Sequence, residues 1–251
     1  MITLSSDFGS PYPAAMRGVI LQRTDARVED VAHDFPRQDV RAAAFWLTQT
    51  LPYFPPAVHC VVVDPGVGTD RDALVVRAGD HAIVAPDNGV ALPAARELAD
   101  EVEAFVWDYE EPASTTFHGR DVFAPAAAAV HEAGVDAVAG MAGTERTDDP
   151  VDLRFPDPEV TGDVARGEVL VVDDFGNAVT NVPGSFLDGA FGDTVAVDGE
   201  RVPVRRAYAA VDADERLVTV GSHGNVELAV NRGRGDEAFG VTAGDGVELT
   251  R

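Results

Sequence analysis

The stretch VHCVVVDPGVGTDR, residues 58–71, predicts the fold of the first part of this chain. Residues 58–63 form a short apolar run that is typical of a buried strand. Directly after this run come a carboxylate, Asp64, then two glycines, and then Arg71. In open parallel α/β sheets, ligands bind beyond the carboxyl ends of the strands. We therefore expect this turn to lie at a functional site.

Strand-like and helix-like segments alternate around this run through residues 1–140. Strands are expected at 1–5, 58–63, 73–78, 81–85 and 102–107, with a hairpin at 73–85, and helices at 14–23, 40–51, 90–99 and 121–133. Asp39 is expected to cap the second helix, and Asp121 is a candidate cap for the fourth. Strands interleaved with helices predict an α/β N-terminal domain with a mainly parallel sheet covered on both faces.

The second part of the chain has a different pattern. Residues 145–163, ERTDDPVDLRFPDPEVTGD, are rich in proline and acids, which is typical of an extended linker. Short alternating runs separated by Gly, Asp and Asn follow at 168–173, 193–197, 216–221, 225–230 and 246–250. They predict a smaller all-β, barrel-like C-terminal domain, with a sandwich as the alternative. We therefore expect an α/β domain at 1–150, a linker at 151–163 and a β domain at 164–251.

The charge is strongly acidic, with 43 Asp and Glu against 19 basic residues and a net charge of −24. Such a chain is expected to repel nucleic acid and anionic membranes. The acids are scattered through periodic segments, as on the hydrated surface of a halophilic protein from a very salty cytoplasm. All basic residues are arginine, which excludes a Walker-type GK[ST] loop, a Schiff-base lysine and pyridoxal-phosphate chemistry.

The remaining composition points to a cytoplasmic protein without a metal. No apolar run approaches 18 residues, and the N-terminus does not resemble a signal peptide. The single cysteine, Cys60, is expected to be a small core residue. The histidines have no ligand spacing, and the pair His33-Asp34, which occurs in metal phosphohydrolases, lacks partner ligands, so we expect no metal site.

Two polar clusters in the first part are candidates for binding or catalysis. Asp7, in SDFG at 6–9, follows a predicted strand and is suited to accept hydrogen bonds from the hydroxyls of a ribose; a helix N-cap or a turn residue is the alternative, which this motif alone favours. Asp64 and Arg71 form either a pair that orients a small polar reactant or an ion pair that closes a turn.

Two further clusters contain a loop histidine and an acidic turn. His118, in TTFHGRD at 115–121, is a titratable group in a loop, which is a favoured place for catalysis, or else an incidental loop residue. In DDFGNAVTN at 173–181, Asp173 is suited to an ammonium group. There Asn177 offers a donor and an acceptor to an adenine edge. A simple hairpin turn is the alternative for that segment.

Taken together and in this order, the motifs resemble one family. The matching pieces are SSDFG at 5–9, DPGVGTDR at 64–71, PDNG at 86–89, TFHGRD at 116–121, DDFGNAVTN at 173–181 and SHGNVELAVNRG at 222–233. The chain is similar over nearly its whole length to the S-adenosyl-L-methionine (SAM) hydroxide adenosyltransferases, or SAM hydrolases, which are relatives of the SAM-dependent fluorinase and chlorinase.

The resemblance implies an enzyme with a β-barrel C-terminal domain that converts SAM and water into adenosine and L-methionine, with no cofactor. It also implies a homotrimer whose active sites lie between one subunit's N-domain and its neighbour's C-domain. Carried over by position, the residues implied to handle the water are Asp64, Arg71 and His118, and the residues implied to hold the substrate are Asp7, Asp173, Asn177, Tyr208 and Ser222. Among the substrate-holding residues, Asp7 matches the carboxylate that binds the ribose in the family, and Ser222 matches a residue that contacts the methionine carboxylate.

The chain departs from the family pattern at two places. The loop at 10–13 is shorter than usual, and His223 stands where halogenating relatives place an arginine on the carboxylate. A SAM-dependent halogenase is one alternative, but those relatives carry a tyrosine at the position of Asp64, and a carboxylate there would repel a halide. The other alternative is a non-catalytic sensor of SAM or adenosine, which would bind without forming product.

Overall fold

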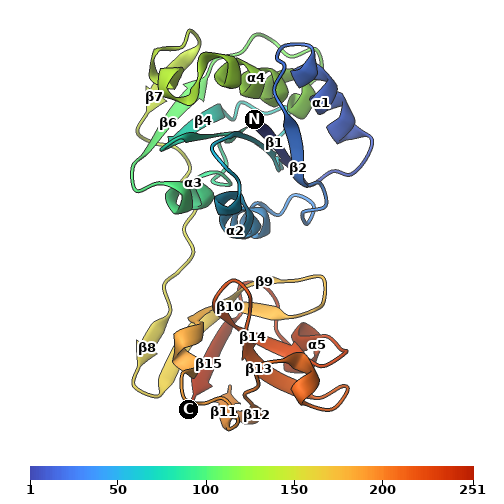
Figure 1. The fold of residues 1–251 in the computed structure, drawn as a ribbon, viewed down its shortest axis with the longest axis vertical. Coiled ribbons are helices and arrows are strands. Elements are labelled where there is room, and N and C mark those ends of the chain that lie inside the picture. Colours follow the sequence, from blue (N-terminus) through green and yellow to red (C-terminus); the bar gives the residue numbers. More distant parts are fainter. The chain divides into compact units, whose positions relative to one another are not determined.

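The computed structural model describes residues 1–251 and divides them into two compact units, Met1–Arg154 and Phe155–Arg251. Figure 1 shows an α/β unit and an all-β unit, which are described separately below. No helix is long and apolar enough to cross a bilayer.

The first unit contains a mixed seven-stranded sheet in the order β2-β1-β3-β5-β4-β6-β7. Its strands are β1 (Ile2–Ser6), β2 (Val28–Ala32), β3 (Val58–Val62), β4 (Ala73–Ala78), β5 (His81–Pro86), β6 (Val102–Trp107) and β7 (Thr144–Thr147). The first four strands in this order, β2, β1, β3 and β5, are parallel to one another. Each of the remaining three, β4, β6 and β7, is antiparallel to the strand before it in the sheet. The predicted hairpin is confirmed, and it is the reason why the prediction of a mainly parallel sheet is only partly right. The tight turn reverses β4, and the strands beyond it alternate in direction.

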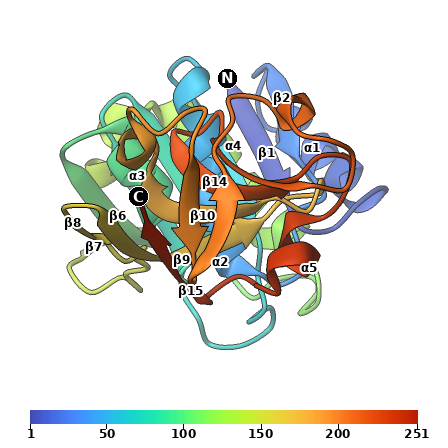
Figure 2. The same ribbon diagram turned by 90° about the horizontal axis from the view of Figure 1, so that it is seen from below.

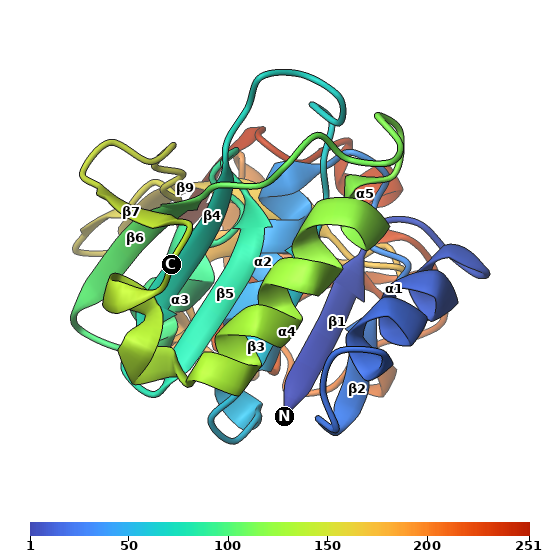
Figure 3. The same ribbon diagram turned by 90° about the horizontal axis from the view of Figure 1, so that it is seen from above.

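Helices cover both faces of this sheet (Figures 1 and 3). Helices α1 (Tyr12–Leu21) and α4 (Ala124–Ala133) lie on one face, and α2 (Val40–Thr50) and α3 (Leu92–Leu98) lie on the other. Asp39 caps α2 as predicted, because its Oδ1 accepts a hydrogen bond from the Ala42 N–H at 2.9 Å. The prediction that Asp121 caps the fourth helix is wrong. A π-helical turn, η2 (Gly119–Phe123), already begins before Asp121, whose carboxylate is paired with Arg120.

The apolar run at the centre of the sheet forms the core, as expected. Every residue of β3 is buried, and Cys60 is fully buried, so burial raises the pKa of its thiol to about 12. The sequence reading missed the two edge strands, β2 and β7. Both carry charged residues and lack a continuous apolar run, which is how exposed sheet edges are commonly protected from further pairing.

The second unit is an antiparallel sheet that nearly closes into a barrel, as Figure 2 shows from below. The strand order is β12-β11-β15-β9-β10-β14-β13, and β8 pairs with β9. The strands are β8 (Glu159–Thr161), β9 (Val164–Val172), β10 (Ala178–Pro183), β11 (Thr194–Val197), β12 (Glu200–Pro203), β13 (Arg216–Val220), β14 (Asn225–Val230) and β15 (Gly246–Thr250); α5 (Gly235–Phe239) follows β14. A bridge between Val204 and Val218 connects the two ends of the sheet, so the predicted barrel-like domain is confirmed.

The segment predicted as an extended linker at 145–163 is partly built into the two units. Strand β7 occupies its beginning and β8 occupies its end, so the irregular stretch is shorter than the sequence suggested. Short polar strands of three or four residues carry no periodic signal that composition alone reveals.

The acidic residues lie almost entirely outside the two cores. Among all Asp and Glu residues, only Glu227 is buried as a whole residue. The surface therefore carries nearly all of the net charge of −24, and its self-repulsion opposes the compact state.

We expect the melting temperature to rise steadily from about 0.01 M to about 1 M KCl, because the Debye length falls over that range from about 30 Å to about 3 Å. Circular dichroism at each salt concentration measures this rise. A variant in which the exposed residues Asp148, Asp157 and Glu159 become Asn or Gln is expected to show a weaker salt dependence. A melting temperature independent of KCl would contradict the self-repulsion argument.

Candidate active site

Arg71 connects the two other members of the predicted trio in the first unit. Its Nε donates to Asp64 Oδ1 at 2.8 Å, and its Nη2 donates to Asp64 Oδ2, so the pair is bidentate. The same Nη2 lies 3.2 Å from His118 Nδ1. The Asp64 and Arg71 side chains are only 5% and 10% exposed, which makes this a nearly buried ion pair rather than a surface one. The structure thus brings Asp64, Arg71 and His118 together.

A glycine in the turn after β3 lets this turn lie close to the loop that carries His118. Gly68 has φ +81°, and a Cβ placed on it would lie 2.7 Å from the carbonyl oxygen of Thr115. Only glycine adopts this backbone conformation readily and also leaves room for that oxygen. At the beginning of the turn, the Asn88 side chain donates to the Val63 carbonyl at 2.8 Å and holds the end of the strand.

His118 is a buried, neutral imidazole in this arrangement. Burial is the main cause that lowers its pKa, and the Arg71 guanidinium lowers it further, against opposite effects of Asp64 and Asp121. A guanidinium only donates hydrogen bonds, so His118 Nδ1 accepts and the ring proton lies on Nε2. The Phe123 ring lies under the Arg71 guanidinium, with 4.9 Å between the ring centroid and Cζ, and closes the cluster on an apolar side.

Asp7 leaves the sheet at the same edge as Asp64. Strands β1 and β3 are parallel neighbours with Ser6 opposite Val62, so the loops that follow them begin side by side. Asp7 Oδ2 accepts a hydrogen bond from the Gln38 backbone N–H at 2.7 Å. The Phe8 and Phe117 rings pack edge to face at 6.0 Å, which joins the Asp7 loop to the His118 loop.

His33 is hydrogen-bonded to the end of the strand that precedes Asp7. Its Nε2 lies 3.0 Å from Asp30 Oδ1, and its Nδ1 lies 2.7 Å from Ser6 Oγ. Ser6 is the last residue of β1, so His33 helps to hold the strand end from which Asp7 projects.

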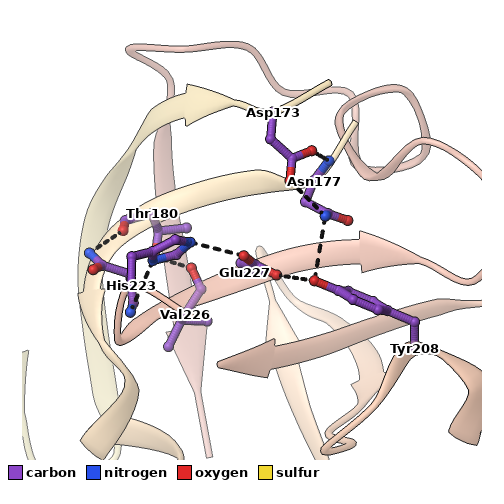
Figure 4. Close-up of polar contacts among 8 residues, drawn as sticks. Asp173, Asn177, Thr180, Tyr208, His223, Val226 and Glu227 are labelled. Carbon is purple, nitrogen blue, oxygen red and sulfur yellow. Dashed lines mark hydrogen bonds and ion pairs between the residues drawn. The ribbon is translucent and has the colours of Figure 1, made fainter. Parts of the chain in front are cut away.

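The second unit contains a separate polar cluster (Figure 4). Asp173 accepts two hydrogen bonds from Asn177, from its backbone N–H at 2.8 Å and from its Nδ2 at 2.9 Å. The Asn177 Nδ2 also lies 3.5 Å from the hydroxyl of Tyr208. The turn between β9 and β10 therefore places Asp173 and Asn177 side by side, as the hairpin reading of this segment required. Both the hairpin and the polar pair are present.

Glu227 is a member of this cluster that the sequence reading missed. It accepts a hydrogen bond from the Tyr208 hydroxyl at 2.8 Å, and its other oxygen lies 2.9 Å from His223 Nε2. Burial and the Glu227 carboxylate both raise the pKa of Tyr208, which keeps the phenol protonated. The signal in the sequence was a lone acid inside the apolar strand β14, NVELAV.

Ser222 is placed differently from the others. It is exposed in the turn between β13 and β14, directly before His223. The structure thus brings Asp173, Asn177 and Tyr208 into one network with Glu227 and His223, and it leaves Ser222 at the surface next to that network.

Each of the two units thus contains a cluster of polar side chains around a nearly buried carboxylate, Asp64 in the first and Glu227 in the second. The sequence model of the family's N-terminal domain, the SAM hydroxide adenosyltransferase N-terminal domain, matches residues 2–139 of this chain. The sequence model of the corresponding C-terminal domain matches residues 167–248. The chain belongs to the SAM hydroxide adenosyltransferase family, which confirms the resemblance found in the sequence.

Known relatives are similar over almost the whole chain. The (R)-S-adenosyl-L-methionine hydrolase of Salinispora tropica is 41% identical over 258 residues, covering 99% of this chain and 97% of the relative. The protein of the same name from Thermus thermophilus is 41% identical over 259 residues, with 97% of each chain covered. A solved structure of an uncharacterized conserved protein from Thermotoga maritima matches with a TM-score of 0.85 at 34% identity, covering all of both chains.

The close approach at Gly68 generates a prediction about the geometry of the trio. We expect Gly68→Ala to lower activity by about 10- to 100-fold, because the added Cβ displaces the loop of His118, and small misplacements in active sites cost rates of this order. The matched control is Gly143→Ala. Gly143 has a similar φ of +82°, but its nearest obstacle lies at 3.5 Å. Equal activity losses in the two variants would show that backbone strain, rather than the position of His118, is responsible.

Proposed function

We propose that this protein hydrolyses SAM to adenosine and L-methionine. The observation that carries the proposal is the buried Asp64–Arg71–His118 cluster, found in a chain that belongs to this family. The names of the relatives from Salinispora and Thermus support the same reaction.

The chemistry of SAM fits what this cluster offers. Attack of water on C5′ forms a C–O bond and breaks the C–S bond of the sulfonium, and the leaving group is the neutral thioether of methionine. Such a leaving group needs no general acid. The difficulty is to orient water, a poor nucleophile, in line with the C–S bond inside a pocket with little free solvent.

We assign to Asp64 the role of the general base that accepts the proton of the attacking water. His118 Nδ1 faces a donor and its Nε2 carries the ring proton, so the imidazole is a hydrogen-bond donor here and orients the water. Asp64 is a carboxylate with lone pairs beyond those that Arg71 uses. The bidentate guanidinium fixes the direction of that carboxylate and keeps the His118 acceptor apart from it.

The remaining residues are proposed to hold the rest of the substrate. Asp7 accepts hydrogen bonds from the ribose hydroxyls, Asp173 holds the methionine ammonium group, Asn177 contacts adenine, Tyr208 lies along the adenine ring, and Ser222 contacts the methionine carboxylate. Support comes from the carboxylate and amide of the second unit, which are fixed before any ligand arrives. At the position where halogenating relatives have an arginine on the carboxylate, we expect His223 to make a weaker contact than that arginine, because its two ring nitrogens already lie against Glu227 and the Asn225 N–H.

We further propose a homotrimer in which the first unit of one subunit and the second unit of its neighbour complete each active site. The ribose and water-handling residues belong to the first unit, and the adenine and methionine contacts belong to the second. A cytoplasmic location and adaptation to high salt remain predictions from the composition.

Incubation of the purified protein with SAM at molar salt is expected to yield adenosine and methionine, which chromatography detects. Asp64→Asn and His118→Ala are expected to lower kcat by about two orders of magnitude or more, as is typical when groups that handle the proton are removed. SAM binding by calorimetry should change little in both variants, whereas Asp7→Ala should weaken it.

Several results would contradict these roles. A halogenated nucleoside formed in the presence of halide would point to the halogenase. SAM binding without product would point to a sensor. A loss of affinity alone in all three variants would show that the division between Asp7 and the water-handling trio is wrong.

Mixing two inactive variants tests the assembly. Asp64→Asn is altered only in the first unit, and Asp173→Ala only in the second, so refolding them together should form some sites with neither change. About a quarter of wild-type activity is expected from random mixing, if each site draws one unit from each of two subunits. Activity that stays at the level of the separate variants would place each site within one subunit.

A further inference from the structure

His33 contacts the strand end that precedes Asp7, yet the reaction proposed above gives this histidine no role. It directly follows β2, where Ala32 lies opposite Ser5 of the parallel neighbour β1, so His33 lies beside Ser6. The His33 Nδ1 is 2.7 Å from Ser6 Oγ. The His33 side chain is 19% exposed, so protons reach it from solvent without any opening of the core.

The other ring nitrogen of His33 carries a proton in both charge states. Its Nε2 lies 3.0 Å from Asp30 Oδ1, and a carboxylate only accepts hydrogen bonds. Burial opposes ionisation of Asp30, but the hydrogen bond from His33 and the Arg17 guanidinium, 2.5 Å away, outweigh it and lower the pKa of Asp30. The charged groups around the ring are thus Asp30 on β2, Arg17 on α1, and Asp7 beyond the Ser6 hydroxyl of β1. Because the Nε2 proton is fixed, titration of the ring changes only Nδ1.

The Ser6 hydroxyl has one hydrogen and two acceptors within reach. One acceptor is His33 Nδ1, and the other is the Phe8 carbonyl at 3.3 Å. In the neutral imidazole Nδ1 accepts, so Ser6 donates to His33 and has no hydrogen left for Phe8. In the imidazolium Nδ1 donates to Ser6 Oγ, and the hydroxyl is free to donate to the Phe8 carbonyl. The two charge states therefore differ by one hydrogen bond that spans Asp7.

The segment after β2 also holds Asp7 by a contact that does not titrate. The Gln38 backbone N–H donates to Asp7 Oδ2 at 2.7 Å in both charge states of His33. Residues 33–38 thus hold the Asp7 turn at two points, the carboxylate itself and the hydroxyl of the preceding serine. The contact at Ser6 is the one that changes with pH.

We propose that His33 is a positioning residue for Asp7: its protonation moves the Ser6 hydroxyl to the Phe8 carbonyl and tightens the turn, so that a ribose binds more strongly at acidic pH. The inference rests on the proposed function, in which Asp7 accepts hydrogen bonds from the ribose hydroxyls. A turn that is closed by an additional hydrogen bond loses less conformational freedom when the ligand binds. By linkage, ribose binding also favours the protonated ring.

The test measures the Kd of adenosine by calorimetry on the purified protein at molar KCl, at about pH 5.5 and about pH 8, since a histidine changes its charge in this range. Adenosine carries the ribose hydroxyls and stays uncharged at both pH values. The wild type is expected to bind it about 3- to 10-fold more tightly at the lower pH, which is the effect of one neutral hydrogen bond.

Two variants test whether this pH dependence comes from His33 and Ser6. Ser6→Ala removes the hydroxyl that changes partner, and His33→Asn removes the titrating ring but keeps a polar group beside Ser6. Both should lower the ratio of the two Kd values by about 3- to 10-fold relative to the wild type. Contributions of other histidines, such as His118, are the same in all these proteins and cancel in the comparison.

The matched control is His131→Asn, which should leave the ratio at its wild-type value. His131 contacts the beginning of β1, 3.4 Å from the Met1 nitrogen, whereas His33 contacts its end. A role of His33 that is only structural would weaken binding equally at both pH values, and this result overturns the inference. An unchanged ratio in Ser6→Ala also overturns it, because His33 would then act through its charge alone. If His33→Asn does not fold, Ser6→Ala carries the same test.

Asp7→Ala separates the inference from the proposed function. This variant should weaken adenosine binding, and adding Ser6→Ala to it should change the ratio no further, because the hydroxyl acts through Asp7. Unchanged affinity in Asp7→Ala overturns both the role proposed for Asp7 and the inference. SAM cleavage by the wild type together with an unchanged ratio in Ser6→Ala overturns the inference and preserves the proposed function.

Discussion

The nearly buried pair of Asp64 and Arg71 is the constraint on which the first unit's site depends. Removing a carboxylate and a guanidinium from water costs several kcal/mol for each ion, so neither is tolerated there without the other. The bidentate geometry recovers part of this cost and fixes both side chains in one orientation. The turn between them must then be compact, and the loop of His118 must lie close to it. The neutral state of His118 follows from the same burial and from the nearby guanidinium.

The topology of the sheet explains why residues distant in the sequence meet at this place. Parallel neighbours β1 and β3 end at the same edge, so the segments that carry Asp7 and Asp64 emerge together. The hairpin of β4 and β5 reverses the sheet only beyond that point and does not disturb the edge. The second unit has no parallel strands, and it builds its cluster differently. A hairpin turn carries Asp173 and Asn177, and an inward carboxylate on the neighbouring strand β14 meets Tyr208.

Sequence patterns predicted the elements with strong periodicity and failed where tertiary pairing decides. The buried strand at 58–63, the cap at Asp39 and the barrel-like second unit were readable, because apolar periodicity and cap chemistry are local. The direction of a strand cannot be predicted from its local sequence, because it depends on which strand it pairs with, as the antiparallel pairing of β6 and β7 shows. The trio of the first unit was suggested by its motifs. Glu227 was missed because an acid in an apolar strand has no meaning until its donors, from other segments, are in place.

Both clusters are ordered by groups whose hydrogen-bonding role cannot change. Arg71 only donates, and this sets the tautomer of His118; Asp173 only accepts, and this sets the amide of Asn177. Imidazole, amide and phenol groups have two possible directions each, so without such fixed ends they would populate several arrangements and orient a ligand poorly. A fixed direction costs nothing at the moment of binding or reaction, because the reorganisation has already occurred during folding. The buried charges therefore contribute to the site mainly by choosing one arrangement of their neutral neighbours.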